Sequence, residues 1–260
     1  MLFAVILFDK IVFGPVVSRR FGKSLGINLL PLDNKVCNFN CIYCECGWTN
    51  VKNTKVKYTS YEDVVSAMQI KFKELGQKGD FPDVITFAGN GEPTMHPQFL
   101  RIIDDTIRLR NEYMPMVKIV ILSNGVLMNK PDVLEALLKV DLCVMKLDAG
   151  NGKLFKIIDQ PLNNKSINWY VQNLKKLGDK LIIQAIFLKG VFNNEFIDST
   201  DESNLNDWLN YVVQLRPKEV MIYTIDRETP AKELEKIPSD ILSNIALRVN
   251  EAGIKAKVYS

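Results

Sequence analysis

Three cysteines in one short stretch are the residues of this chain best suited to metal chemistry. Cys37, Cys41 and Cys44 follow the spacing C-x3-C-x2-C. Thiolates are soft ligands that suit zinc, copper(I) and iron–sulfur clusters. Because a structural zinc usually takes four ligands from two separated hooks, three cysteines in one hook favour a [4Fe–4S] cluster with one iron left open for a small molecule. Zinc-bound or simply buried cysteines are the alternative.

Six apolar runs alternate with helical patterns and must position this stretch. The runs predict buried strands at 26–30, 83–88, 117–122, 142–147, 181–188 and 220–225. A helical repeat follows each strand, and the first repeat has Ser60 as its cap and Val64, Met68, Phe72 and Leu75 on one face. A short strand or hairpin is expected within 1–20, and an edge strand at 254–259.

Six β–α units in succession require parallel strands, because each helix carries the chain back to the same end of the sheet. A complete barrel of eight units does not fit this count. We therefore predict an α/β fold, a partial (βα)6 TIM-like barrel, with a doubly wound open sheet as the alternative. One domain is expected over 1–260, divided into an N-terminal extension (1–24), a barrel core (25–225) and a C-terminal loop, helix and edge strand (226–260).

Polar residues gather where the predicted strands end, and parallel β/α folds bind their ligands there. The cysteine stretch follows the first strand. Further polar groups near the ends of the later strands, or within the fifth, are Gly89 to Thr94, Ser123, Asn124, Asp148, Gln184 and Tyr223.

The fourth strand separates polar from apolar side chains by parity. Lys146 and Asp148 share one face, whereas Cys143 lies on the other. If the polar pair faces the barrel interior, Cys143 packs against the helices as a structural thiol.

The cysteine stretch resembles the signature of the radical S-adenosylmethionine (radical SAM) enzymes, in which an aromatic residue precedes the third cysteine, as Tyr43 does here. Asn90-Gly91-Glu92 is similar to their Gly-Gly-Glu motif, with Asn90 in place of the first glycine. The resemblance implies one [4Fe–4S] cluster, bound S-adenosylmethionine, and an electron donor such as flavodoxin or ferredoxin. It also implies reductive cleavage of S-adenosylmethionine to a 5′-deoxyadenosyl radical that abstracts hydrogen from a substrate.

The same resemblance assigns side chains to the cofactor. The motif at 90–92 would face the amino group, the pair at 123–124 the ribose or carboxylate, and the later strands the nucleoside. The alternatives are simple turns at 89–94 and 124–125, and a core position for the last aromatic. The assigned residues are Tyr43, Asn90, Gly91, Glu92, Ser123, Asn124, Asp148, Gln184 and Tyr223.

Outside these motifs, Arg19, Arg20 and Arg227 are candidate substrate contacts, because arginine can bind a carboxylate or phosphate through two hydrogen bonds. Solvated turns are the alternative. We expect Cys46 to pack near the cluster without a catalytic role. The connection at 189–200 is long enough to form a lid.

The composition bounds the setting of the protein more than its substrate. Of 260 residues, 47% are hydrophobic, and the net charge is +3. The apolar start lacks the flanks of a signal peptide, and no apolar run is long enough to span a membrane. We therefore expect a cytoplasmic protein without a membrane partner.

The order of the Gly14–Arg20 segment, the cysteines and the Gly89–Pro97 segment resembles a branch of iron–sulfur oxidoreductases related to the tRNA wyosine-synthesising enzymes. Those enzymes carry a second cluster, for which this chain has no spare cysteine set. RNA is the leading substrate hypothesis, and a small molecule or a protein side chain is the alternative. A basic rim near the cysteines supports RNA and comprises Arg19, Arg20, Lys23, Lys35, Lys52, Lys55 and Lys57.

Overall fold

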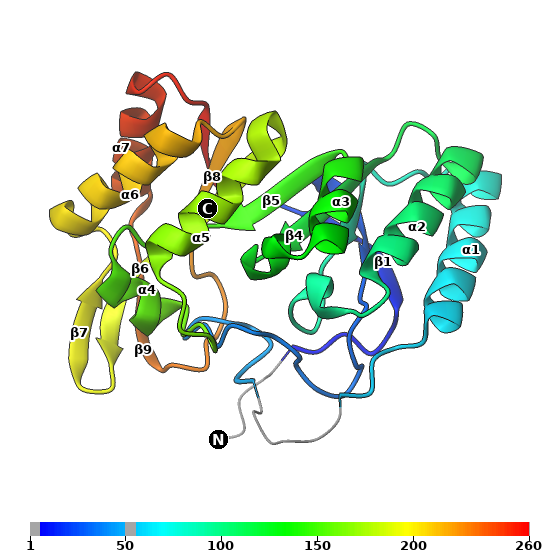
Figure 1. Ribbon diagram of the computed structural model, residues 1–260, viewed down its shortest axis with the longest axis horizontal. Coiled ribbons are helices and arrows are strands. Elements are labelled where there is room, and N and C mark those ends of the chain that lie inside the picture. Colours follow the sequence, from blue (N-terminus) through cyan, green and yellow to red (C-terminus); the bar gives the residue numbers. More distant parts are fainter. Residues whose placement is uncertain (1–5, 50–55, 260) are drawn as a thin grey trace.

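The structure, a computed structural model, describes residues 6–49 and 56–259. A single continuous sheet forms its centre, and the strands follow one another in chain order along it (Figure 1). The strands of this path are β1 (Val12–Ser18), β2 (Gly22–Ile27), β3 (Val84–Phe87), β4 (Lys118–Ser123), β5 (Leu142–Lys146), β6 (Leu181–Phe192), β8 (Glu219–Thr224) and β10 (Ala256–Tyr259).

The pairing of these strands defines a partial barrel. Every pair from β2 to β10 is parallel, and β1 joins β2 as an antiparallel hairpin. The sheet stays open because β1 and β10 lie at opposite ends of the strand order. A doubly wound sheet requires a reversal of strand order, which this path lacks, so the predicted partial barrel with an N-terminal hairpin is confirmed.

Helices cover the outer face of the sheet in chain order, from α1 at the right of Figure 1 to α7 at the left. Ser60 caps α1 by accepting from the Asp63 amide, as its position predicts. No helix among residues 6–49 and 56–259 is both long and apolar enough to cross a membrane. The helices are α1 (Tyr61–Lys78), α2 (Phe99–Tyr113), α3 (Pro131–Lys139), α4 (Gly152–Ile158), α5 (Ile167–Leu174), α6 (Glu202–Leu215) and α7 (Ser239–Glu251), with 3-10 turns η1 (Pro93–Met95), η2 (Val126–Asn129) and η3 (Lys175–Lys180).

Apolar side chains form two layers, one on each face of the sheet. The larger layer lies between strands and helices and contains Cys143, whose thiol donates to the Leu137 carbonyl oxygen at 2.9 Å. The smaller layer lies inside the barrel and comprises Val84, Val120, Val144, Ile182 and Met221, and a further apolar cluster includes Ile42 of the cysteine loop. The parity inferred for the fourth strand therefore holds, since Cys143 packs against the helices and Lys146 turns inward.

The connection at 189–200 is a β-hairpin, so the expectation of a long lid loop was wrong. β6 runs on to Phe192 and pairs with β7 (Glu195–Asp198) and with β9 (Glu233–Lys236). Asn193 and Asn194 form the two-residue turn, both with positive φ (53° and 62°). Asparagine tolerates this left-handed conformation, and such turns suit two-residue hairpins.

The first predicted strand ends earlier than expected, at Ile27 rather than at Leu30. The Asn28 side chain accepts from the amides of Leu30 and Asn90, at 3.2 and 3.1 Å. This side-chain turn takes the place of strand pairing and directs the chain into the cysteine stretch.

Trp208 of α6 anchors the end of β5 and provides a test of the packing. It is 1% exposed, and its indole N–H donates to the Leu147 carbonyl oxygen at 2.9 Å. Trp208→Phe should lower the free energy of unfolding by about 1–3 kcal/mol, because a buried carbonyl loses its donor. Urea unfolding followed by circular dichroism measures the loss.

Trp169→Phe is the matched control, since Trp169 is half-buried and its indole N–H donates to no described residue. Equal destabilisation by the two substitutions would contradict the assigned role of Trp208.

Candidate active site

The cysteine stretch lies over the carboxyl ends of the strands because its backbone is bonded to them. The Val36 amide donates to the Asn90 carbonyl oxygen at 2.8 Å, and the Glu92 amide donates to the Val36 carbonyl oxygen at 3.0 Å. Gly91 lies between these bonds with φ 134°, and a Cβ there would lie 1.8 Å from the Val36 oxygen. Only glycine permits this approach, so the Gly91 signal in the sequence has a structural cause.

The three cysteines of the motif differ in their surroundings. The Cys37 sulfur accepts from the Phe39 amide at 3.4 Å and from the Asn124 side-chain amide at 3.8 Å. The buried Cys41 thiol donates to the Asp159 carboxyl at 3.7 Å. Burial raises the pKa of Cys37 to about 11 and the pKa of Cys41 well above its ordinary value.

Cys44 is the exception, because a hydrogen bond from the Cys46 thiol lowers its pKa to about 5. The ammonium of Lys35 acts in the same direction. Cys46 contacts the Gly89 carbonyl oxygen at 3.4 Å, and donating to the Cys44 sulfur raises its own pKa. Cys46 thus packs beside the motif, in agreement with the expectation from sequence.

Glu92 connects the ends of β3 and β4 through its buried carboxylate. It accepts from the Thr94 amide and hydroxyl at 3.1 and 2.5 Å, from the Ser123 hydroxyl at 2.7 Å, and from the Asn124 amide at 2.8 Å. Burial raises the pKa of Glu92, and these hydrogen bonds oppose the rise. Four donors occupy the lone pairs of a carboxylate, so Glu92 orders its neighbours.

Asn90 has no exposed surface, and protein groups bind its whole side chain. Its oxygen accepts from the Phe8 amide at 2.8 Å, and its nitrogen donates to the carbonyl oxygens of Phe8 and Pro31 at 2.9 and 2.8 Å. The side chain therefore holds the N-terminal segment against the barrel. The departure from Gly-Gly-Glu at this position has a structural explanation.

A buried charged cluster lies inside the barrel beside Cys41. The Lys146 ammonium lies 2.8 Å from an Asp148 carboxylate oxygen and 3.7 Å from Asp159. The Tyr43 hydroxyl bonds to both Lys146 and Asp148. Asp148 also accepts from the Ile186 amide at 3.1 Å. These charged side chains connect Tyr43, the aromatic residue of the cysteine motif, to the end of β5.

Two pKa shifts in this cluster have clear causes. Burial alone would lower the pKa of Lys146, but the Asp148 carboxylate raises it well above its ordinary value. Burial and the adjacent Asp148 raise the pKa of Asp159. Sequence reasoning missed Asp159, because its partners Cys41, Lys146 and Asp148 stand on other segments and meet it only in the folded chain.

Gln184 and Tyr223 lie together, but each already has a partner. The Arg20 guanidinium donates to the Gln184 side-chain oxygen at 2.5 Å, and its carbon lies 5.3 Å from the centre of the Tyr223 ring. This arginine supplies the polar partner that the buried Gln184 side chain requires. Arg20 enters the barrel from the turn between β1 and β2.

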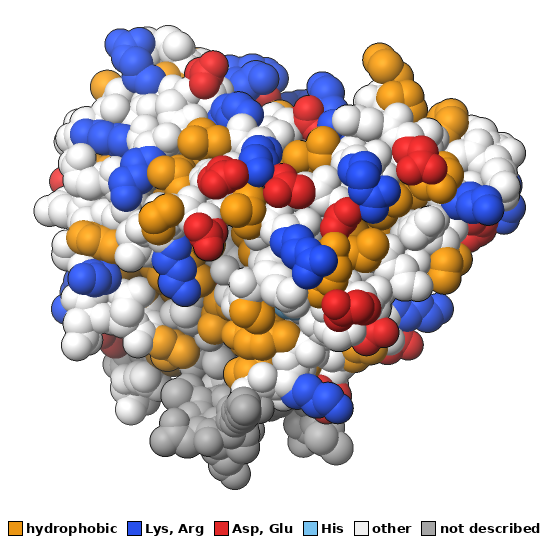
Figure 2. All heavy atoms as spheres, turned by 45° about the vertical axis from the view of Figure 1, so that its right-hand side comes forward, with side chains coloured by type: hydrophobic (Ala, Val, Ile, Leu, Met, Phe, Trp, Pro, Cys, Tyr) orange, Lys and Arg blue, Asp and Glu red, His pale blue; other side chains and the backbone are white. Residues whose placement is uncertain are grey.

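The other two candidate arginines and one lysine of the expected basic rim pair with acids. Arg19 pairs with Asp226 at 3.5 Å, Arg227 with Glu45 at 2.6 Å, and Lys23 with Asp80. Lys35 is buried and Lys57 is exposed, while Lys52 and Lys55 lie outside the described residues. Figure 2 shows the face with α1 to α3 forward, where basic and acidic side chains intermingle.

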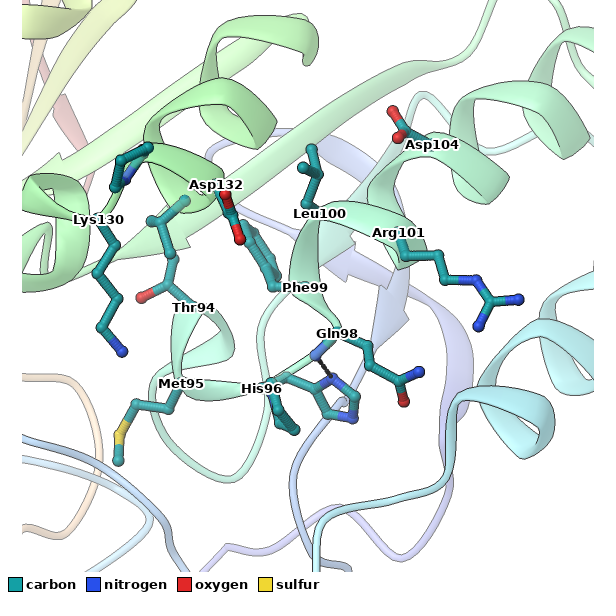
Figure 3. A pocket seen from close by; sticks show the side chains of 13 residues that line it. Thr94, Met95, His96, Gln98, Phe99, Leu100, Arg101, Asp104, Lys130 and Asp132 are labelled. Atoms are coloured by element: carbon teal, nitrogen blue, oxygen red, sulfur yellow. Dashed lines mark hydrogen bonds between the residues drawn. The ribbon is translucent and has the colours of Figure 1, made fainter.

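Two surface hollows lie away from the cysteines. One of about 660 Å³ lies between η1, α2 and α3, and another of about 820 Å³ lies between α4 and the β6–β7 hairpin. Figure 3 shows His96 in the first, with its ring accepting from the Gln98 amide at 3.1 Å. Its second nitrogen lies 2.9 Å from the Thr59 carbonyl oxygen, so His96 braces a loop.

The donor set fits an iron–sulfur cluster. All three motif sulfurs come from one loop, and two N–H groups point at the Cys37 sulfur, as cluster-bound thiolates favour. Among the described residues, no three Cys, His, Asp or Glu side chains converge as ligands of a single ion. A cubane cluster does not need three ligands that converge on one ion, because each of its three cysteines binds a different iron.

A parallel partial barrel that presents three such thiols at the carboxyl ends of its strands defines the class of radical SAM enzymes. The family profile described as "Radical SAM superfamily" matches residues 34–202. The chain therefore belongs to the radical SAM superfamily and is an enzyme of that type, as its motif predicted.

Sequence relatives include proteins named UPF0026. The chain is 34% identical over 241 residues to the UPF0026 protein of Helicobacter pylori, covering 91% of this chain and 73% of that protein. It is 28% identical over 254 residues to the one of Methanocaldococcus jannaschii, covering 95% and 74%. A Brachyspira hyodysenteriae protein named GTPase Obg is 32% identical over 267 residues, but the match spans only 36% of its length.

Solved structures share the fold. A radical SAM methyltransferase from Sphaerobacter thermophilus superposes with a TM-score of 0.63 at 16% identity, covering 90% of this chain and 65% of that one. SuiB of Streptococcus suis, bound to S-adenosylmethionine, gives 0.62 at 12% identity, covering 90% and 50%. At these identities the likeness establishes the partial barrel alone.

The thiol pair Cys44–Cys46 can be tested in the metal-free protein. Because the pKa of Cys44 is about 5, Cys44 is a thiolate above that pH, and its alkylation by iodoacetamide should hardly change from pH 6 to pH 8. Alkylation of Cys37, with a pKa of about 11, should increase steeply over the same range. Peptide mass spectrometry measures both rates.

Cys46→Ala removes the hydrogen bond to Cys44 and should restore a steep pH dependence at Cys44. Cys143→Ala is the control, because Cys143 lies on the helix side of the sheet. An unchanged Cys44 profile in Cys46→Ala would contradict the pairing.

Proposed function

We propose that this enzyme binds one [4Fe–4S] cluster through Cys37, Cys41 and Cys44 and cleaves S-adenosylmethionine reductively. The observation that carries the proposal is the loop itself, which holds three thiols between the polar ends of β3, β4 and β5. When bound, the cluster supplies one electron to the sulfonium, giving methionine and a 5′-deoxyadenosyl radical that takes hydrogen from the substrate.

The residues of the chain have distinct roles in this proposal. Glu92 fixes the backbone of Asn124 and the hydroxyl of Ser123, and this orders the strand ends that face S-adenosylmethionine. Asp148 accepts from the Tyr43 hydroxyl, the Lys146 ammonium and the Ile186 amide, and these bonds fix its carboxylate at the end of β5 beside the proposed S-adenosylmethionine site. Tyr43 is held by this carboxylate and presents its ring beside the third cysteine.

Anaerobic reconstitution tests the proposal directly. The wild-type protein should bind about four irons per chain, as a single cubane requires, and should form 5′-deoxyadenosine from S-adenosylmethionine after reduction with dithionite. Cys37→Ala, Cys41→Ala and Cys44→Ala should lose both iron and product. Iron analysis and chromatography of the products measure the two quantities.

Cys143→Ala is the matched control, since it removes a thiol from the opposite face of the sheet and should retain iron and product. A colourless wild-type protein with one zinc and no 5′-deoxyadenosine would instead support the alternative of a non-catalytic metal module.

RNA remains our hypothesis for the substrate, and it rests on the resemblance to the wyosine-related branch. Four members of the proposed basic rim are buried or bonded to other side chains, which removes part of its physical support. A small molecule or a protein side chain is the alternative class.

Binding of bulk tRNA to the reconstituted protein at two salt concentrations tests the RNA hypothesis. Phosphate contacts predict an affinity that falls steeply with salt, and Lys57→Gln should weaken it because Lys57 is an exposed member of the rim. Absence of binding at low salt would exclude RNA and leave the other two classes.

A further inference from the structure

Lys35 is a buried cation without a carboxylate partner. It is 7% exposed, and its ammonium donates to the Gly47 carbonyl oxygen at 2.8 Å. No Asp or Glu of residues 6–49 and 56–259 forms a salt bridge with it, and the remaining residues include neither type. The ammonium also hydrogen-bonds the Cys44 sulfur and lies close enough to Cys37 and Cys41 to interact with them electrostatically. A buried charge needs a counter-charge, and here that charge has to come from the cysteine loop.

Lys146 shows how the same protein buries a lysine with its own counter-charge. The Lys146 ammonium lies 2.8 Å from Asp148 and 3.7 Å from Asp159. Glu45, the acid nearest to the motif in sequence, pairs with Arg227 at 2.6 Å. The charge of Lys35 is therefore one that no Asp or Glu of the described residues balances, and its counter-charge comes from the cysteine loop.

The position of Lys35 is fixed from both of its ends. The next residue, Val36, is bonded through its backbone to the end of β3. At the other end the ammonium binds Gly47, whose amide donates to the Cys44 carbonyl oxygen at 2.8 Å. The Lys35 side chain thus links the two ends of the segment 35–47, which contains the three cysteines.

We propose that Lys35 is a positioning residue that balances the negative charge of the thiolate-bound cluster and raises its reduction potential. The inference rests on the proposed function. Three thiolates outweigh the charge of an oxidised cubane core, and reduction adds one more negative charge. A fixed cation beside the sulfurs stabilises the reduced state more than the oxidised one, because net charge and hydrogen bonds to sulfur set cluster potentials.

The test is a redox titration of the reconstituted protein, followed by the electron paramagnetic resonance signal of the reduced cluster. Lys35→Gln keeps a hydrogen-bond donor but removes the charge, and its midpoint should become more negative. We expect at least a tenfold change in the reduction equilibrium, which is about 59 mV for one electron. Lys35→Arg keeps the charge and should stay near the wild-type midpoint.

Lys118→Gln is the charge-matched control, because Lys118 is exposed at the amino end of β4. If Lys35→Gln titrates like the wild type, the proposal is overturned. If Lys35→Gln fails to load iron while Lys35→Arg loads it, the charge is needed to hold the cluster, and the proposal stands. If neither Lys35→Gln nor Lys35→Arg loads iron, Lys35 acts as a steric support of the loop, and the proposal is overturned. A wild-type protein without iron would instead refute the proposed function.

Discussion

Main-chain hydrogen bonds hold the cysteine loop to three segments that follow three different strands, and the rest of the site depends on them. Val36 is bonded after β3, the Ile42 amide donates to the Ile158 carbonyl oxygen at 3.0 Å after β5, and the Ala231 amide donates to the Ile42 carbonyl oxygen at 3.1 Å after β8. Because buried backbone groups must be paired, these contacts fix the thiols relative to the strand ends. The loop therefore behaves as part of the sheet, although it contains no regular strand.

The sequence predicts the features that local patterns encode. Parity along β5 placed Cys143 and Lys146 on opposite faces correctly, because side chains alternate along any strand. The apolar repeat of α1 and the cap at Ser60 were readable for the same reason. The cysteine spacing identified the superfamily, because a cubane bound by one loop restricts where its ligands stand in the chain.

Features set by distant partners were not readable from the sequence. Asn90 appeared to be a substitution within a ligand motif, but its side chain binds Phe8, which lies 82 residues away. Asp159 gave no signal, since its contacts with Cys41 and Lys146 exist only after the strands assemble. Lys35 appeared to be a surface charge near the motif, because nothing local distinguishes a lysine that folds inward.

The N-terminal hairpin is part of the barrel and cannot be separated from it as an extension. A boundary after residue 24 would cut through β2, and Phe21 packs on the inner apolar layer with Tyr259 from the opposite edge. Arg20 then occupies the polar face of Gln184 and lies over the ring of Tyr223. The hairpin therefore delivers a guanidinium to the inner face of the barrel, where it takes the hydrogen-bond acceptor of Gln184 and covers the ring of Tyr223.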